Sequence, residues 1–320
     1  MGESRKVKGV VNMKRKNTLF KDVSLDWIEW KSTYIKESTY NYYLYELETY
    51  INPSIGENPI IQVGNTHIQN AVCEWEKRLS TGTIKNLVMV IASVLSYAKQ
   101  NGLTIDCNFN VAYKGSSFQQ PCKVYGHYEQ LAISDALMKS TDYRTLGIAL
   151  ALYEGMRIGE ICALRWSDID FEKSIIHVNK TLQRLYLPEG DLKTKLVIQT
   201  AKTRHSNRDI PISTPMLKLL RKFETPKSVG YVTSCSEKLI EPRNLRRYYQ
   251  GFISNLHIAP LKFHALRHTF ATTCIENGGD YKIVGDLLGH ANISTTINLY
   301  VHPRWEEKMK TIELACENTQ

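Results

Sequence analysis

The strongest constraint on the fold is one long amphipathic stretch, TIKNLVMVIASVLSYAKQNG, at residues 83–102. Its apolar residues recur at spacings of three and four, which places them on one face of a helix. They are Ile84, Leu87, Val88, Ile91, Leu95 and Ala98. Gly102 is suited to end that helix. An apolar stripe of this length must be covered by neighbouring elements, so the sequence predicts a helical domain around it.

Shorter helical patterns before this stretch complete the same domain. They are LFKDVSLDWIEWKSTY, which carries Phe20 in its apolar stripe; STYNYYLYELETYINPSIG, expected to start at a Ser38/Thr39 cap and to end near Pro53 and Gly56; and HIQNAVCEWEKRL, which Thr66 could cap. We therefore expect a basic tail at residues 1–19 and a helical domain at residues 20–103. Residues 104–122 have little periodicity and contain Gly, Ser and Pro, which predicts a linker.

The remaining residues, 123–320, change character twice. Helical patterns in HYEQLAISDALMKS and DYRTLGIALALYEG are followed by four short β-rich runs, SIIHVN, LQRLYL, KLVIQTA and RDIPIS. Helical patterns return from about Pro242. The expected fold class is mainly α: a small helical domain followed by an α-rich domain with a small antiparallel β-sheet near its middle.

Composition restricts the classes of partner. The formal net charge of +9 suits a polyanion such as DNA, although a basic soluble protein without such a partner has the same charge. We find no run of eighteen apolar residues, and the basic N-terminus lacks the apolar core of a secretory signal. The 7 cysteines are scattered without a C-x-x-C pair, and no His/Cys cluster has zinc-like spacing, which predicts reduced thiols in a cytoplasm and no structural metal. No cofactor is expected.

Two segments of the second domain offer cations to an anion. Arg157, in YEGMRIGE, stands between Gly155 and the next helical pattern, where backbone N–H groups and a guanidinium favour an anion. An ordinary surface arginine explains this segment alone equally well. Lys202 lies in the polar turn of QTAKTRHSNRDIPI and can reach toward a ligand, but an ordinary hairpin lysine is the simpler interpretation of that residue by itself.

Two later segments add polar side chains. His264 and Arg267, in FHALRHTFATT, share a helix face and suit a pair of phosphate oxygens, with a structural hydrogen-bonded pair as the alternative. In LLGHANISTTINLYVH, Gly289 permits a close approach and His290 supplies a donor. Ser294 or Thr295 could cap a helix that carries Tyr300, which could equally be a core residue.

Taken in order, these motifs resemble those of the tyrosine recombinase (phage integrase) family. They are GMRIGE, a hairpin lysine before RDIPI, HALRHTFA, LGH and TTINLY. The resemblance covers the whole second domain, and the helical first domain is similar to the core-binding, DNA-binding domain of that family. Each motif is weak singly, but their order and spacing together are specific. The second domain is therefore expected to be a catalytic recombinase domain.

The resemblance implies how the site holds a DNA phosphate. Arg157 and Arg267 resemble the family arginines that bind the non-bridging oxygens, and both stay charged at every relevant pH. His290 resembles a donor to a phosphate oxygen. Glu160 resembles an acidic residue that orients its neighbours and does no chemistry itself.

The resemblance also implies the covalent step. Tyr300 resembles the nucleophile, and His264 the residue that assists with the phenolic proton. Lys202 resembles the general acid that protonates the leaving 5′-hydroxyl. The product is a 3′-phosphotyrosyl link, which conserves the energy of the phosphodiester, so rejoining needs neither ATP nor a metal.

The use we expect is integration and excision of a mobile element. DNA dimer resolution and DNA inversion use the same chemistry, and a type IB topoisomerase or a catalytically silent DNA-binding regulator are further alternatives. Only about twenty residues precede the first helical pattern, so an arm-binding domain is either absent or reduced to the basic tail.

The expected partners are double-stranded DNA with specific recombination sites, further copies of the chain in dimers and tetramers on DNA, and host or element-encoded DNA-bending factors. No membrane is expected, and the expected location is the cytoplasm, associated with the nucleoid. Residues 304–320 carry a helical apolar stripe that could dock on its own domain or on a neighbouring subunit. The stripe consists of Trp305, Met309, Ile312 and Cys316.

Overall fold

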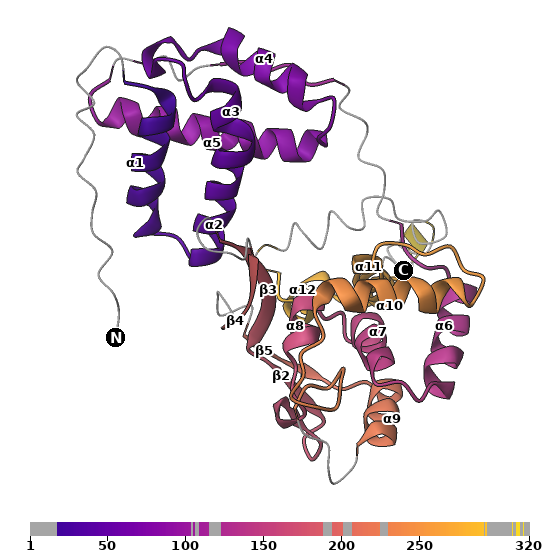
Figure 1. Cartoon of the computed structure of the whole chain (residues 1–320). Helices are drawn as coiled ribbons and strands as arrows, with labels where there is room; N and C mark the ends of the chain where they lie inside the picture. Colours follow the sequence, from indigo (N-terminus) through magenta and orange to yellow (C-terminus); the bar gives the residue numbers. More distant parts are fainter. Residues whose placement is uncertain are drawn as a thin grey trace. The chain divides into compact units, whose positions relative to one another are not determined.

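The chain folds into two compact units (Figure 1). The computed structural model describes residues 18–103, 105, 109–114, 123–187, 194–200, 207–224, 230–290 and 292, together with Met309, Ile312, Glu313 and Cys316. Unit 1 comprises Met1–Gln119 with Arg184–Lys195, and unit 2 comprises Gln120–Gln183 with Leu196–Gln320. The described residues are mainly helical with small β-sheets, so the expected fold class is confirmed.

Unit 1 is helical, as its apolar periodicity predicts. Its elements are α1 (Phe20–Ser32), α2 (Glu37–Glu46), the π-helical turn η1 (Leu47–Ile51), α3 (Asn52–Ile55), the 3₁₀ turn η2 (Ile60–Gln62), α4 (Asn65–Trp75) and α5 (Thr81–Gln100). The two caps expected from the sequence are wrong. α2 begins at Glu37, so Ser38 and Thr39 lie inside its first turn, and α4 begins at Asn65 because Gly64 takes the extended cap conformation.

Helix α5 organises the core of unit 1. Ser80 caps it by accepting a hydrogen bond from the Thr83 amide, and its apolar stripe is buried against α1, α4 and η1. Among the described residues, α5 is the one helix long and apolar enough to cross a membrane by length and composition. Since its apolar stripe lies in the core of this unit, the length and composition of α5 do not by themselves indicate a membrane span.

Unit 2 surrounds a nearly fully buried helix. Its helices are α6 (His127–Lys139), α7 (Arg144–Tyr153), α8 (Ile158–Ala163), the 3₁₀ turn η3 (Trp166–Asp168), α9 (Thr214–Phe223), α10 (Pro242–Ser254), α11 (His264–Glu276) and α12 (Tyr281–Leu288). The central helix is α7, which packs against α6, α8, α9, α10 and α11 (Figure 1). The turn that follows α7 is therefore held on several sides by other elements.

The described strands form two small sheets. They are β1 (Ile169–Asp170), β2 (Ile175–Val178), β3 (Lys180–Tyr186), β4 (Thr194–Thr200) and β5 (Arg208–Pro211). The first sheet has the order β1-β2-β5, with both pairs antiparallel, and β3 pairs with β4 in the second. The four strands expected from the sequence are present, but they divide between two sheets where one was expected.

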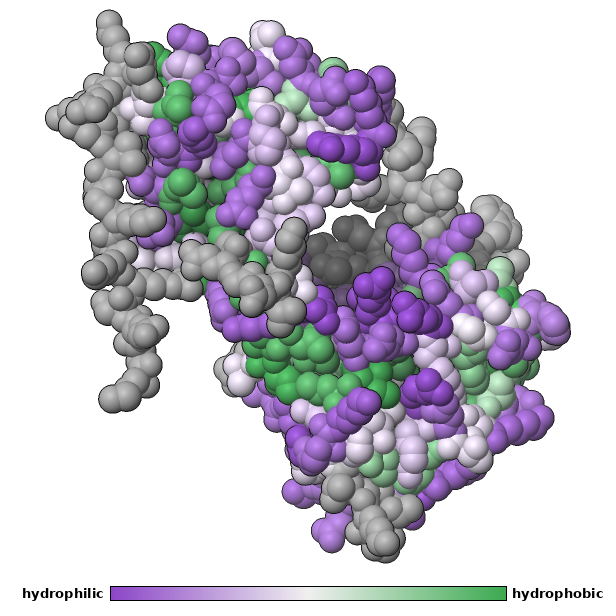
Figure 2. All heavy atoms as spheres, viewed as in Figure 1, coloured by the Kyte–Doolittle hydropathy of each residue, from purple (hydrophilic) through white to green (hydrophobic). Residues whose placement is uncertain are grey.

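The surfaces of the two units carry mainly the polar faces of their helices. In Figure 2 hydrophilic residues cover much of the visible face of each unit, with hydrophobic areas between them. The cysteines among the described residues form no disulfide, while Cys107 and Cys122 lie outside those residues. Met309, Ile312 and Cys316 are helical and exposed, but Trp305 and most of the tail lie outside the described residues, so the expected docking is not tested.

The turn after α7 depends on a glycine. Gly155 has a left-handed backbone with φ of 63°, and a Cβ there would lie 2.5 Å from Cδ1 of Phe270 and 2.8 Å from Cδ2 of Leu288. Both the backbone angle and the space around it exclude a larger residue. In contrast, a Cβ on Gly251 in α10 would meet nothing within 4 Å.

These two glycines give a paired prediction. Gly155→Ala should lower the free energy of unfolding by about 2–5 kcal/mol, because left-handed strain adds to overpacking. Gly251→Ala should raise it by up to about 1 kcal/mol, because alanine favours a helix interior. Urea unfolding of both variants measures the difference. A Gly155→Ala protein as stable as Gly251→Ala would contradict this account of the turn.

Candidate active site

The turn between α7 and α8 presents Arg157 at the start of a helix. Arg157 is the N-cap residue of α8, in extended conformation, as its position in the sequence predicts. Its Nη1 donates to Oε1 of Glu160 at 2.9 Å, and its backbone N–H donates to Oε2 of Glu160 at 3.0 Å. Its Nη2 donates to the carbonyl of Gly289 at 2.8 Å. Because 36% of its side chain is exposed, Arg157 is accessible to a ligand.

Helix α11 contributes His264 and Arg267 to the same place. Arg267 is buried, and its Nη1 donates to the carbonyl of Gly155 at 2.7 Å, which ties α11 to the turn that carries Arg157. Its Nη2 donates to the carbonyl of Leu288 at 2.7 Å and lies 2.9 Å from Nε2 of His290. A guanidinium can only donate, so Nε2 of His290 accepts and its ring is unprotonated on that nitrogen.

The C-terminal end of α12 is where these side chains meet. The last carbonyls of a helix have no partner within the helix and carry its negative dipole end. Here the carbonyls of Leu287, Leu288 and Gly289 accept hydrogen bonds from three different arginines, Arg208, Arg267 and Arg157 respectively. Gly289 ends the helix in left-handed conformation, and the chain continues directly into His290.

Sequence reasoning missed Arg208. Its Nη1 and Nη2 donate to the two carboxylate oxygens of Glu160 at 3.1 and 3.0 Å, and only 7% of each side chain is exposed. The sequence RDIPI indicated a strand, in which alternate residues point to the same face. Ile210 of that strand is buried, so the alternation could have placed Arg208 on the inner face as well.

The cluster is strongly cationic, and this changes its titration. Burial, followed by the charges of neighbouring arginines and a histidine, lowers the pKa of His264 and of His290 to about 4. Burial and the charge of Arg157 lower the pKa of Arg267 to about 9, so it remains charged at neutral pH. Burial opposes ionisation of Glu160, but hydrogen bonds and charge from Arg208 and Arg157 hold its pKa below the ordinary value.

Five of the candidate residues therefore lie together, and two are not tested. The structure brings together Arg157, Glu160, His264, Arg267 and His290. Lys202 and Tyr300 lie outside the described residues, as do the expected cap at Ser294 or Thr295 and the helix that follows it. Within the described part of the chain, no group of three or more His, Cys, Asp or Glu side chains could hold a metal ion.

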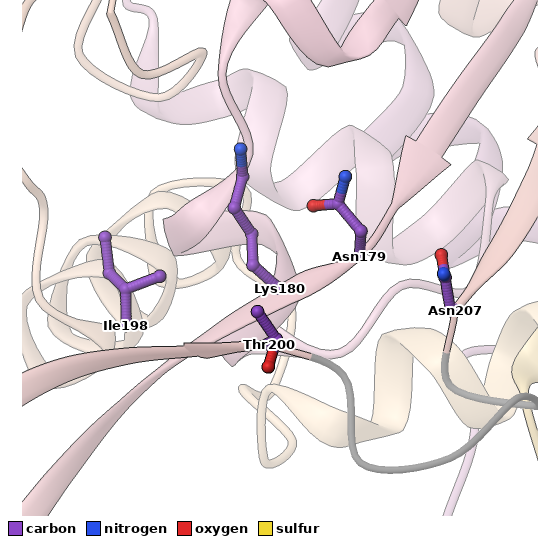
Figure 3. A pocket seen from close by; sticks show the side chains of 5 residues that line it. All are labelled: Asn179, Lys180, Ile198, Thr200 and Asn207. Atoms are coloured by element: carbon purple, nitrogen blue, oxygen red, sulfur yellow. The ribbon is translucent and has the colours of Figure 1, made fainter.

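A pocket lies among residues of β3 and β4 and the residues just before β3 and β5. Its volume is about 420 Å³, and it is lined by Asn179, Lys180, Ile198, Thr200 and Asn207 (Figure 3). Figure 3 shows Asn179, Lys180 and Asn207 pointing to the same side of the strands. Nζ of Lys180 donates to Asp168 at 2.9 Å. Thr200 and Asn207 of this lining flank residues 201–206 in the sequence, the segment that contains Lys202 and lies outside the described residues.

Comparison with known protein families identifies the chain. The phage integrase central domain matches residues 20–110, and the phage integrase family matches residues 124–307. The second match alone covers more than half of the sequence. The chain therefore belongs to the phage integrase family.

Two curated relatives carry names within this family. The XerC-like tyrosine recombinase of Caldanaerobacter subterraneus subsp. tengcongensis is 35% identical over 182 residues, which are 51% of this chain and 46% of that protein. The ICEBs1 integrase of Bacillus subtilis is 26% identical over 249 residues, which are 71% of this chain and 63% of that protein. The chain therefore spans less than two thirds of the length of either relative.

Solved structures share the fold. The Tn1549 transposon integrase in complex with a circular intermediate DNA superposes with a TM-score of 0.76 at 18% identity, covering 93% of this chain and 99% of that one. A lambda integrase dimer bound to a COC′ core site gives a TM-score of 0.64 at 17% identity, covering 88% and 77% of the two chains. At these identities the likeness is one of fold.

The histidine environment gives a pH prediction. His264 and His290 should titrate near pH 4 in the protein without DNA, because burial and the arginine charges disfavour imidazolium. The unfolded chain, with ordinary values near 6.5, then binds more protons between pH 6.5 and 4, so the free energy of unfolding should fall as the pH falls through this range. NMR titration, with His264→Gln and His290→Gln used for assignment, measures both values.

A bound anion provides the control for this titration. Sulfate or phosphate held among the arginines should raise both pKa values, because it offsets the positive charge. Titration of both rings at their ordinary pKa without any anion would show that the cationic cluster does not act on them.

Proposed function

We propose that this protein is a site-specific DNA recombinase that cuts and rejoins DNA strands through a 3′-phosphotyrosyl intermediate, in the integration and excision of a mobile element. The observation that carries the proposal is the gathering of Arg157, Arg267, His264 and His290 from three separate segments at the end of α12. The segment that follows this helix end leads, ten residues after His290, to Tyr300. Family membership and the relative named ICEBs1 integrase support the same conclusion.

The chemistry suits a phosphodiester. Its oxygens repel a nucleophile, so phosphoryl transfer depends mainly on positioning and on stabilisation of charge. Arg157 and Arg267 would bind the non-bridging oxygens, and His290 would donate to one of them after a proton shift. Because these groups are already held by the end of α12 and by Glu160, the reaction requires little reorganisation of the protein.

Proton transfer is assigned to the remaining residues. Tyr300 would attack phosphorus while its phenolic proton passes to His264, whose low pKa leaves it neutral and able to accept a proton at neutral pH. The anionic phosphate would stabilise the imidazolium so formed. Lys202 would protonate the departing 5′-hydroxyl, and Glu160 would orient Arg157. A second 5′-hydroxyl reverses the step and joins a new strand, with no metal or ATP in the chemistry.

The domain assignment is part of the same proposal. Residues 20–103 would be the DNA-binding core-binding domain, residues 104–122 a linker and residues 123–320 the catalytic domain, with the basic tail of residues 1–19 as a further DNA contact. The net charge of +9 supports a DNA partner. The proposed location is the cytoplasm, on the nucleoid.

The proposed assemblies are dimers and tetramers on DNA recombination sites, with DNA-bending factors as accessory partners. Structural neighbours include the lambda integrase dimer on its core site and a lambda integrase tetramer bound to a Holliday junction. Dimer resolution or inversion would use the same residues. Recombination on plasmids that carry paired sites in direct or inverted orientation distinguishes resolution and inversion from integration. Relaxation of a supercoiled plasmid that carries no recombination site would instead indicate a type IB topoisomerase.

The nucleophile gives the first test. Tyr300→Phe should retain DNA affinity and lose covalent attachment completely, because only the attacking oxygen is removed. Labelled DNA that comigrates with denatured protein measures the attachment. Tyr281→Phe is the matched control, since Tyr281 lies at the start of α12, away from the cluster at its end. The Tyr281→Phe protein should attach to DNA as the wild type does. Covalent attachment that persists in Tyr300→Phe would contradict the assignment of Tyr300 as the nucleophile. If Tyr281→Phe also lost attachment, Tyr281 would be the nucleophile instead.

The general acid gives the second test. A DNA substrate with a bridging sulfur in place of the 5′ oxygen has a leaving group that needs no proton. Lys202→Ala should cleave this DNA at about the wild-type rate and ordinary DNA much more slowly. Single-turnover cleavage of both substrates measures the difference. Equal defects on the two substrates would reduce Lys202 to a phosphate contact.

A further inference from the structure

Arg208 donates hydrogen bonds from all three nitrogens of its guanidinium group. Its Nε donates to the carbonyl of Leu287 at 2.7 Å, and its Nη1 and Nη2 donate to both carboxylate oxygens of Glu160 at 3.1 and 3.0 Å. One planar side chain from β5 therefore joins the start of α8 to the end of α12. Only 7% of its side chain is exposed, so it is not placed to meet a large ligand.

Charge divides the arginines into two kinds. A buried carboxylate requires a partner in excellent geometry, and Glu160 has one in the two-pronged contact with Arg208. That pair is neutral as a whole. Arg157, which also contacts Glu160, is then the surplus cation, and it is the more exposed of the two arginines. The structure thus leaves Arg157 available to an anion while Arg208 balances the charge of Glu160.

The two arginines also make parallel connections. Arg157 bridges Glu160 and the carbonyl of Gly289, and Arg208 bridges Glu160 and the carbonyl of Leu287. If Arg157 turns donors toward a phosphate, its bridge weakens. The bridge through Arg208 would still hold α8 and the end of α12 together, and with them the position of His290.

We propose that Arg208 is a positioning residue: it fixes the start of α8 relative to the end of α12, so that Arg157 can exchange its protein contacts for the phosphate without loss of the site. It touches no DNA and acts through Glu160, Arg157 and the segment after α12. This inference rests on the proposed recombinase function for its catalytic effect, but its structural half concerns the protein alone.

Lysine cannot replace Arg208 fully. An ammonium is a single point of charge, and it lacks the planar fork that spans two carboxylate oxygens and a carbonyl. Arg208→Lys keeps the charge that balances Glu160 and loses the bridge, whereas Arg208→Gln loses both. Arg144→Gln is the matched control, because Arg144 makes a comparable two-pronged pair with Asp142 at the other end of α7.

Hydrogen exchange tests the structural half in the protein without DNA. The amides of Gly289 and His290 donate to Asp286 and Gly285 at 2.9 Å. Their exchange should accelerate by about tenfold or more in Arg208→Gln and by less in Arg208→Lys, because the helix end opens more often. Arg144→Gln should leave both amides unchanged. Unchanged exchange in folded Arg208→Lys and Arg208→Gln would overturn the positioning role whatever the enzymology shows.

Covalent attachment to DNA tests the catalytic half. In single turnover, Arg208→Gln should slow attachment by about 10–100-fold, the scale known for residues that orient catalytic groups, with DNA affinity nearly unchanged. Arg157→Ala should slow it by about 10²–10³-fold. Because the Arg208 bridge is the one that still joins α8 to the end of α12 when the Arg157 bridge is absent, the double variant should be slower than Arg157→Ala alone. A double variant no slower than Arg157→Ala would overturn the positioning role of Arg208 in catalysis.

A neutral phosphate analogue separates positioning from a general loss of structure. Replacing a non-bridging oxygen by methyl removes the charge that Arg157 would bind. The defects of Arg157→Ala and Arg208→Gln should both shrink on this methylphosphonate DNA, whereas a general folding defect would persist. An undiminished Arg208→Gln defect contradicts the inference. Wild-type protein that forms no covalent link to ordinary DNA refutes the proposed function instead, and the exchange experiment still decides whether Arg208 fixes the helix end.

Discussion

The cluster depends on one physical constraint: the guanidinium groups of Arg157, Arg208 and Arg267 must all be hydrogen-bonded, although the described residues offer them a single carboxylate. Glu160 is the carboxylate bonded to Arg157 and Arg208. The other acceptors are three backbone carbonyls at the C-terminal end of α12, the carbonyl of Gly155 and Nε2 of His290. A helix end supplies several unpaired carbonyls and a negative dipole at once. The position at which α12 ends therefore decides whether these arginines can be held together, and Gly289 sets that position.

This arrangement leaves a surplus of positive charge that is organised before any ligand arrives. Burial, together with this charge, lowers the pKa of His264 and His290 to about 4 and so keeps both rings neutral at physiological pH. An anion that enters would reduce the repulsion among the arginines and raise the pKa of both rings. The site would therefore become better able to accept and return protons when a phosphate is bound, which links binding to proton transfer through charge alone.

The sequence predicts the parts of this structure that burial and local geometry decide. The stripe of α5, the strands β2 to β5 and the position of Arg157 before α8 follow from periodicity and from residue type. The resemblance to tyrosine recombinases indicated that Arg157, Glu160, His264, Arg267 and His290 belong together, and they do. The helix caps at Ser38/Thr39 and Thr66 were wrong because hydroxyl-bearing residues are common inside first turns, and a glycine or lysine in extended conformation serves as the boundary.

Arg208 shows why the rest could not be read from the sequence. Its partners lie 48 residues before it, at Glu160, and 79 residues after it, at Leu287. One of them is a backbone carbonyl, a group that every residue carries and that no motif can mark. In the sequence, only the alternation of β5 and the glycine after α12 indicate where these contacts form. Both features can be interpreted only when the fold shows that β5 and α12 lie against α8. Where a site is held by backbone acceptors, its reactive side chains can be recognised from motifs, but the residues that fix their geometry emerge only from the fold.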